Sequence, residues 1–259
     1  MFNHFFSGIC IGIANLIPGV SGGTIAVIFG IYDDIITAIN TIISTPLQSI
    51  SAIKKITILG LGALTGIYAF SFVIVRLMAS YEASTLMFFM GLILGSIPVI
   101  YRQQPNLKLT PVAALLLCLG VGLVAGLCFL QPVKLTITPL ILILSGGIAT
   151  CTMVIPGISG SMVLLILGTY ESIVGAVSTG DLAALFWIAV GAIFGGIIAI
   201  KSIHFLLHRF MNNGYHLIIG LMIGSVFQLA YPLTLSTTLS SLMGIVTIVF
   251  ISNYLNQPH

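Results

Sequence analysis

Most of the chain consists of long apolar runs separated by short polar stretches. Six of these runs are about 17 to 25 residues long, the length that a helix needs to cross a hydrocarbon core of about 30 Å. They predict six membrane-spanning helices, at residues 56–77, 84–101, 109–130, 182–203, 214–231 and 233–251. Two further apolar segments, 5–32 and 143–170, are each interrupted near the middle by proline and glycine.

The two interrupted segments are copies of one another. Residue n between 7 and 39 pairs with residue n + 138, and 12 of these 33 positions are identical. The matches include the sequence Pro-Gly-x-Ser-Gly at 18–22 and again at 156–160. A duplicated break inside apolar sequence is typical of transporters built from two repeats.

Glycines later in the chain extend the duplication. Gly62 pairs with Gly191 and Gly91 with Gly220, and in each case a second glycine follows four residues later. This small-residue spacing favours close helix packing in lipid more than contact with a ligand. The sequence therefore predicts a single membrane domain over 1–259, with repeats at 1–135 and 136–259.

The composition excludes a soluble domain. Hydrophobic residues make up 58% of the chain, charged residues only 5%, and the mean hydropathy is +1.22, whereas soluble domains carry about a quarter charged residues. The net charge is +3 and the basic residues are scattered, which argues against nucleic acid as a partner.

The distribution of basic residues indicates how the interrupted segments run. If both are hairpins, six basic residues fall on one side of the membrane and two, Arg76 and Lys134, on the other; if both cross, the split is four against four. The positive-inside rule favours the hairpins and places both termini in the cytoplasm. We therefore predict an all-α polytopic membrane protein of two inverted repeats. Each repeat has a re-entrant helical hairpin (5–32 or 143–170), with arms of about 13 residues, plus three transmembrane helices.

The two breaks have the chemistry of an anion site. Proline and glycine end one half-helix, and Ser21 and Ser159 are placed to cap the next. The backbone N–H groups of residues 20–23 and 158–161 would then be unpaired within the membrane and would face an anion. The alternative is a kink that binds nothing. The candidate binding residues are Pro18, Gly19, Val20, Ser21, Gly22, Gly23 and Thr24 in the first repeat, and Pro156, Gly157, Ile158, Ser159, Gly160 and Ser161 in the second.

Arg76 and Lys201 are candidates for additional positive charge. Two helix dipoles supply about +1 together, against about −1.5 to −2 for a phosphate monoester. Lys201 lies one helical turn from the position equivalent to Arg76, and inversion would bring the two side chains near opposite membrane surfaces. Arg76 would then receive a phosphate at the outer side and Lys201 release it at the inner side. The alternative is that both side chains simply reach lipid headgroups.

Asp33 and Glu171 are matched acids in a chain that has few acids. They are candidates for coupling to a proton or a sodium ion, and the alternative is a solvated hairpin end. His204 and His208 have a spacing that allows metal binding, but no third ligand accompanies them, so no metal site is expected.

Both breaks resemble the signatures of a known family. Residues 15–26 and 30–33, together with 155–161 and 168–171, are similar to the two motifs of the PopT polyprenyl-phosphate transporters, a membrane family long catalogued as a domain of unknown function. The resemblance implies translocation of undecaprenyl phosphate from the outer to the inner leaflet of the prokaryotic cytoplasmic membrane. This step recycles the lipid carrier of peptidoglycan and other envelope polymers. The halves differ at Asn15 and Met153, at Gly23 and Ser161, and at Thr24 and Met162, so we expect an asymmetric site.

Two other functions are considered. A transporter or channel for a small inorganic anion would use the same helix ends. A lipid phosphatase would need a nucleophile and a base beside clustered basic residues, and the sequence shows no such set. We therefore expect a transporter with no catalytic residues and no cofactor. The oligomeric state is not indicated by the sequence.

Overall fold

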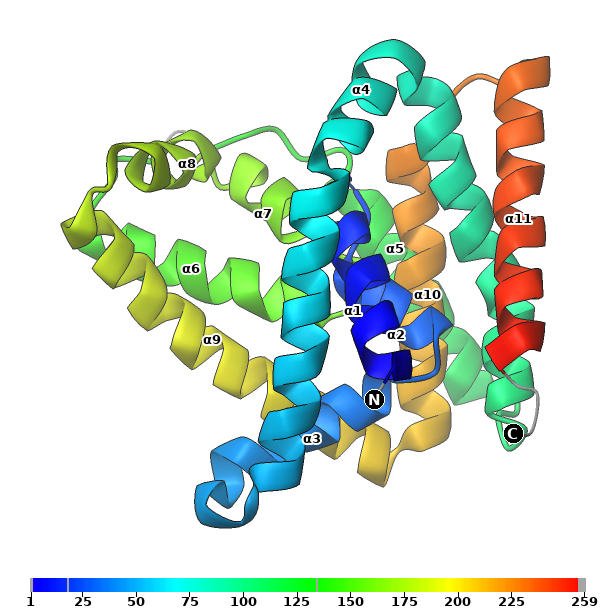
Figure 1. Cartoon of the computed structure of the whole chain (residues 1–259), viewed down its shortest axis with the longest axis horizontal. Helices are drawn as coiled ribbons and strands as arrows, with labels where there is room; N and C mark the ends of the chain where they lie inside the picture. Colours follow the sequence, from blue (N-terminus) through cyan, green and yellow to red (C-terminus); the bar gives the residue numbers. More distant parts are fainter. Residues whose placement is uncertain (1, 18, 134, 256–259) are drawn as a thin grey trace.

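The structure, a computed structural model, describes residues 2–17, 19–133 and 135–255, and its regular structure within them is helical throughout (Figure 1). Pro18, a predicted binding residue, and Lys134 lie outside the described residues. The helices are α1 (Phe2–Asn15), α2 (Gly22–Ile28), α3 (Tyr32–Ser44), the short 3-10 helix η1 (Pro46–Gln48), α4 (Ile50–Gln103), α5 (Pro111–Leu127), α6 (Pro139–Val154), α7 (Gly160–Ile166), α8 (Tyr170–Thr179), α9 (Leu182–Arg209), α10 (Met211–Leu229) and α11 (Leu235–Leu255).

The prediction of six spans is confirmed in part. α4 contains the first two in one helix of 54 residues, bent at Tyr81, where φ is −142° and ψ is 39°. Among the described residues, α4, α9 and α11 are long and apolar enough to cross a membrane. The bent pairs α2–α3 and α7–α8 raise the number from three to as many as five. α5, at the predicted span 109–130, has only 17 residues. The chain is thus an all-helical, multi-pass membrane protein.

The second arms of the two predicted hairpins are shorter than expected. Instead of about 13 residues, α2 and α7 have seven residues each. They are followed by Gly30 and Gly168, with φ of 69° and 66°, in the left-handed region that glycine adopts without strain. The chain then bends by 117° into α3 and by 112° into α8. Tyr32 and Tyr170 therefore begin new helices.

The helices pack in the same pattern in both halves of the chain. α1 packs along the first part of α4, and α6 packs along α9. The last helix of each half packs on the other half: α5 lies on α10, and α11 lies on the second part of α4 (Figure 1). Each half therefore contributes to the core of the other.

Glycines permit the closest of these contacts, which confirms the packing role predicted for them. A Cβ on Gly62 would collide with the carbonyl oxygen of Phe5, and a Cβ on Gly191 with that of Ile143. Tight contacts of the same kind between helices involve Gly66, Gly91, Gly95, Gly195, Gly220 and Gly224.

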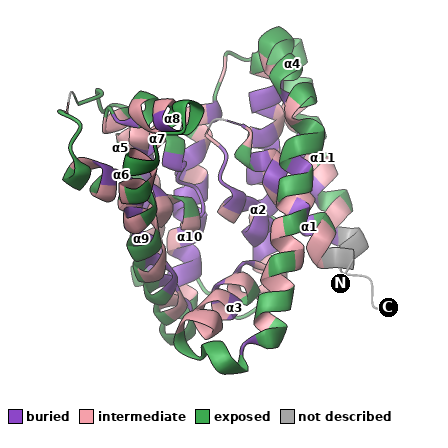
Figure 2. Cartoon of the chain, turned by 60° about the vertical axis from the view of Figure 1, so that its left-hand side comes forward, coloured by how far each residue is buried: buried purple, intermediate pink, exposed green. Residues whose placement is uncertain are grey.

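Burial in this structure has the distribution expected of a protein in lipid. Figure 2 shows buried residues gathered on α2 and α10 near the centre, with the outer faces of α4 and α9 largely exposed. Those outer faces carry large apolar side chains, including Tyr68, which is 89% exposed, and Phe194, which is 63% exposed. Extensive exposed apolar surface on long helices is what contact with hydrocarbon requires.

Candidate substrate-binding site

Both Pro-Gly breaks interrupt helices as predicted. The first separates α1 from α2 and the second separates α6 from α7. Gly19 and Gly157 have φ of 81° and 85°, which other residues rarely adopt. Gly157 is also tightly enclosed, because a Cβ there would collide with the backbone of Leu221.

The two breaks meet at a cavity of about 290 Å³ whose walls are part polar and part apolar; because hydroxyl and amide side chains face it, we call it the polar cavity. Ser21 of the first break and Ser159 and Ser161 of the second line it, together with Asn15 and Tyr170. The two breaks, which lie more than a hundred positions apart in the chain, therefore come together at one place. The remaining lining residues are Leu16, Ile17, Val20, Met153, Ile158, Gly160 and Leu164.

The predicted binding residues divide into two groups. Those in contact with the cavity are Val20, Ser21, Ile158, Ser159, Gly160 and Ser161. The described residues that support the breaks without lining the cavity are Gly19, Gly22, Gly23, Thr24, Pro156 and Gly157.

Hydrogen bonds join the two halves beside this cavity. The Thr24 hydroxyl oxygen accepts a hydrogen bond of 2.9 Å from the backbone N–H of Gly157, and Thr24 is only 1% exposed. The Tyr32 hydroxyl donates to the carbonyl oxygen of Val154 at 2.9 Å. Side chains of the first half thus bond to the backbone in the second break and at the end of α6 just before it.

The amides of the first break are mostly occupied. Ser21 caps α2 as predicted, accepting from the N–H of Gly23 at 3.2 Å. The Asn15 side-chain oxygen accepts from the N–H of Gly22 at 3.0 Å, and the N–H of Val20 bonds to the carbonyl of Ile17 at 3.2 Å. The expectation that the amides from Val20 to Gly23 are unpaired is therefore wrong for three of the four. The side chain of Asn15, which reaches back from α1, is one cause.

The second break leaves more donors available. Ser159 stands at the N-cap of α7 but makes no side-chain cap; its hydroxyl instead pairs with that of Ser161 at 2.9 Å. The N–H of Ile158 bonds to the carbonyl of Ile155 at 3.5 Å, so the expected unpaired amide is wrong there. Among the described residues, no acceptor is found for the backbone N–H groups of Ser159, Gly160 and Ser161, where the expectation holds. Met153 occupies the position equivalent to Asn15 and has no amide oxygen to offer. The two breaks therefore differ in hydrogen bonding, in the direction that the sequence differences suggest.

Neither predicted basic residue lies at the cavity. Arg76 and Lys201 are both exposed, and the described residues that line the cavity are all uncharged. Any role for these two side chains would lie outside the polar cavity in this arrangement.

Comparison with known proteins assigns the family. Residues 11–247 match the family model described as undecaprenyl phosphate translocase-like. The chain is a member of the undecaprenyl phosphate translocase-like family. The chain is also similar to a Vibrio cholerae protein named polyprenyl-phosphate transporter, with 33% identity over 234 residues, covering 86% of this chain and 75% of that protein.

A second relative, from Staphylococcus aureus, bears the same name. It is 29% identical over 244 residues, covering 86% of this chain and 84% of the relative. No solved structure matches the chain significantly. The resemblance seen in the two break motifs is thus confirmed at the level of the family.

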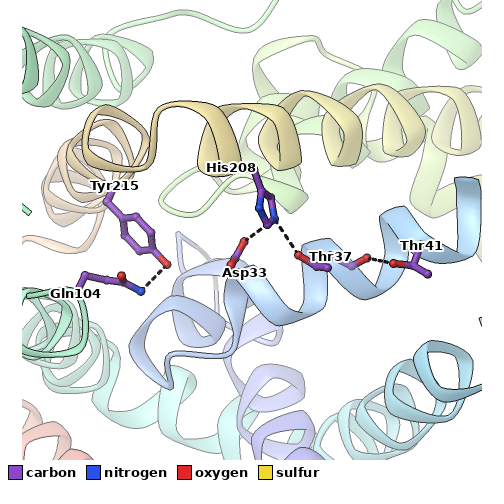
Figure 3. A network of polar contacts seen from close by, with 6 residues as sticks. All are labelled: Asp33, Thr37, Thr41, Gln104, His208 and Tyr215. Carbon is purple, nitrogen blue, oxygen red and sulfur yellow. Dashed lines mark hydrogen bonds and ion pairs between the residues drawn. The ribbon is translucent and has the colours of Figure 1, made fainter. Parts of the chain in front are cut away.

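In this translocase-like chain, Asp33 faces the second half (Figure 3). Its Oδ1 atom lies 3.6 Å from Nε2 of His208 on α9, and the same nitrogen is 3.2 Å from the hydroxyl of Thr37. The Oδ1 atom is shielded from solvent and has no hydrogen-bond partner within the described part of the chain. Glu171, its counterpart, is exposed and has no ion pair among the described residues. Asp33 and Glu171 therefore occupy equivalent positions in the two repeats but have different surroundings.

Two side chains in this region of the translocase-like fold were not predicted as site residues. His208 drew attention only through its spacing to His204, and Tyr32 was not among the predicted binding residues. Tyr32 is 3% exposed, and its hydroxyl bonds to Val154 at the end of α6, next to the second break. Its match to Tyr170 across the repeat was a visible signal, but the contacts of both residues depend on how the halves dock.

Proposed function

We propose that this chain moves a polyprenyl phosphate, undecaprenyl phosphate foremost, from the outer to the inner leaflet of the prokaryotic cytoplasmic membrane. The family and the names of both relatives support the substrate class. The observation that carries the proposal is the polar cavity where the two breaks meet, inside a chain whose outer faces are apolar. A charged headgroup crossing hydrocarbon needs such a polar enclosure, while the tail stays in lipid.

The phosphate would be held mainly by the second break. The available amides of Ser159, Gly160 and Ser161 and the nearby hydroxyls are the donors that an oxyanion needs. The start of α2 adds the positive end of its dipole, worth up to about half a charge. Its amides at Gly22 and Gly23 are engaged by Asn15 and Ser21. The two breaks therefore have unequal roles in the proposed site.

The two repeats would be inverted, each with a re-entrant hairpin, so that rearranging them exposes the headgroup to either side in turn. Two observations support this proposal. The split of basic residues, six against two, favours hairpins and cytoplasmic termini. The start of α1 and the end of α11 also lie toward the same edge of the molecule in Figure 1.

Arg76 and Lys201 would receive and release the phosphate at opposite membrane surfaces. We expect Arg76→Ala to lower the affinity for lipid phosphate presented from outside by about tenfold, the worth of one charge-assisted hydrogen bond. Transport would fall with it, whereas Lys201→Ala would mainly slow release on the inner side. Transport assays with lipid supplied to one leaflet test this. Unchanged affinity and transport in Arg76→Ala would leave that residue with headgroup contact alone.

Asp33 and Glu171 would couple transport to a proton or sodium ion. Asp33 is tested first because its Oδ1 atom is shielded from solvent and accepts no hydrogen bond within the described residues, so that a cation could bind there in place of His208. We expect Asp33→Asn to remove the acceleration of transport by an imposed ion gradient while leaving the rate without a gradient largely unchanged. Proteoliposomes with and without proton or sodium gradients provide the measurement. If Glu171→Gln alone abolished the acceleration, the coupling residue would be Glu171.

The proposed function is tested by leaflet-resolved translocation of labelled undecaprenyl phosphate in proteoliposomes. We expect wild-type protein to move the lipid between leaflets faster than protein-free vesicles do. Inorganic phosphate flux is measured in the same preparation. Flux of phosphate without lipid movement would identify a small-anion transporter instead.

A further inference from the structure

A second cavity of about 290 Å³ lies where α5, α9 and α10 meet. Leu123 of α5, Leu206 of α9, and Leu217 and Ile218 of α10 line it, and the surface that faces the cavity is apolar throughout. Both α5 and α9 pack on α10, and side chains of these three helices form most of its walls. Such a cavity offers nothing to an ion and suits hydrocarbon.

This apolar cavity adjoins the polar cavity at the second break. Ile158 lines both, and it directly precedes Ser159, whose amide is available for phosphate. Pro156 of the same break lines the apolar cavity only. The second break thus lies between the polar cavity and the apolar cavity, and its backbone is shared by both walls.

The apolar cavity also reaches the lipid-facing surface. Leu123 is 53% exposed, and Ser202, which also lines the cavity, is exposed on α9. In contrast, Ile218 is only 4% exposed at the inner wall. The space therefore extends from the bilayer to the immediate neighbourhood of the headgroup cavity.

We propose that this apolar cavity binds the isoprenyl units nearest the phosphate of the substrate, an inference that rests on the proposed function. A polyprenyl phosphate carries hydrocarbon directly on the phosphate oxygen, so a polar compartment next to a purely apolar one matches it. A phospholipid has glycerol ester oxygens at that point, and these would be left without hydrogen-bond partners. The adjoining cavities would thus select the type of lipid as well as hold it.

Paired substitutions on α5 test the assignment. Leu119 and Leu123 are leucines one turn apart with similar exposure, 55% and 53%, but only Leu123 lines the cavity. Binding of farnesyl phosphate and of inorganic phosphate is measured on the full chain in detergent. We expect Leu123→Trp to weaken farnesyl phosphate binding by about tenfold relative to inorganic phosphate. Leu119→Trp should retain the wild-type ratio of the two affinities.

A second variant keeps the test possible if Leu123→Trp does not fold. Leu206→Trp fills the same cavity from α9 and should lower the same ratio. A wild-type ratio in both Leu123→Trp and Leu206→Trp would overturn the tail-binding assignment while leaving the proposed function standing. Ile39 lines a separate apolar groove beside α3. If Ile39→Trp weakened farnesyl phosphate binding relative to inorganic phosphate while the other two variants kept the wild-type ratio, the assignment would also be overturned. Wild-type protein that binds neither ligand would argue against the proposed function itself.

Discussion

Ser159→Phe is expected to abolish translocation of undecaprenyl phosphate while leaving the protein folded. Ser159 lines the polar cavity and is 6% exposed, so a phenyl ring there occupies the space between the two breaks. The substitution also removes the hydroxyl paired with Ser161. Because the headgroup could no longer approach the amides of the second break, we expect a fall in rate of about a hundredfold or more. Leaflet-resolved transport in proteoliposomes is the measurement, and Ser21→Phe should act in the same direction.

Two control variants distinguish filling of the cavity from loss of the Ser159 hydroxyl and from the addition of a phenyl ring as such. Ser159→Ala keeps the cavity and all backbone amides, so its rate should fall by only about tenfold, the worth of one hydroxyl contact to a charged group. Ser178→Phe adds the same ring at an exposed position on α8 and should transport normally. Near-normal transport by folded Ser159→Phe would show that the headgroup travels elsewhere.

Gly157→Ala is expected to destabilise the protein severely. An L residue with the φ of 85° seen at Gly157 costs about 1–2 kcal/mol. The added Cβ would collide with the backbone of Leu221 on α10, and overpacking of this kind costs about 1–3 kcal/mol more. The second break would have to move away from α10, which would disturb the bond between Thr24 and the N–H of Gly157. Thermal unfolding in detergent and transport assays give the two readouts.

Gly180 provides the matched control for this substitution. Its φ is 68°, close to that of Gly157, but a Cβ there would meet nothing within 4 Å. Gly180→Ala should therefore show the conformational cost alone, about 1–2 kcal/mol, with transport retained. Equal losses of stability in the two variants would mean that α10 yields to the added methyl group.

The local architecture followed from sequence because its causes are local. Proline and glycine interrupt helices wherever they occur, so the breaks and the cap at Ser21 could be predicted from the repeated motif. Small residues four apart, such as Gly62 and Gly66, likewise indicated tight helix contacts. The short second arms were missed even though Gly30 and Gly168 match in the repeat. A glycine between apolar runs fits a hairpin end as well as a sharp bend.

Which hydrogen-bond donors the site offers, and which side chains meet there, depends on contacts that no local sequence pattern specifies. Which break keeps its amides available is decided by the Asn15 side chain, which folds back onto the N–H of Gly22. The sequence showed that Met153 replaces Asn15 but not where either side chain points. The approach of Asp33 to His208 and the bond from Gly157 to Thr24 both cross between the halves. Such contacts require the docked structure, because the residues involved lie more than a hundred positions apart.

The unequal breaks also bear on the thermodynamics of the proposed cycle. A site whose donors come mainly from one half would bind phosphate with one affinity when it is open to the outer face and with another when it is open to the inner face. The transporter would therefore be saturated at different lipid concentrations in the two leaflets. Such an asymmetry changes rates but not the final distribution, since affinity differences cancel around a closed cycle without an energy source. Net recycling would then be driven by consumption of the lipid at the inner face or by an ion gradient, and never by the shape of the site alone.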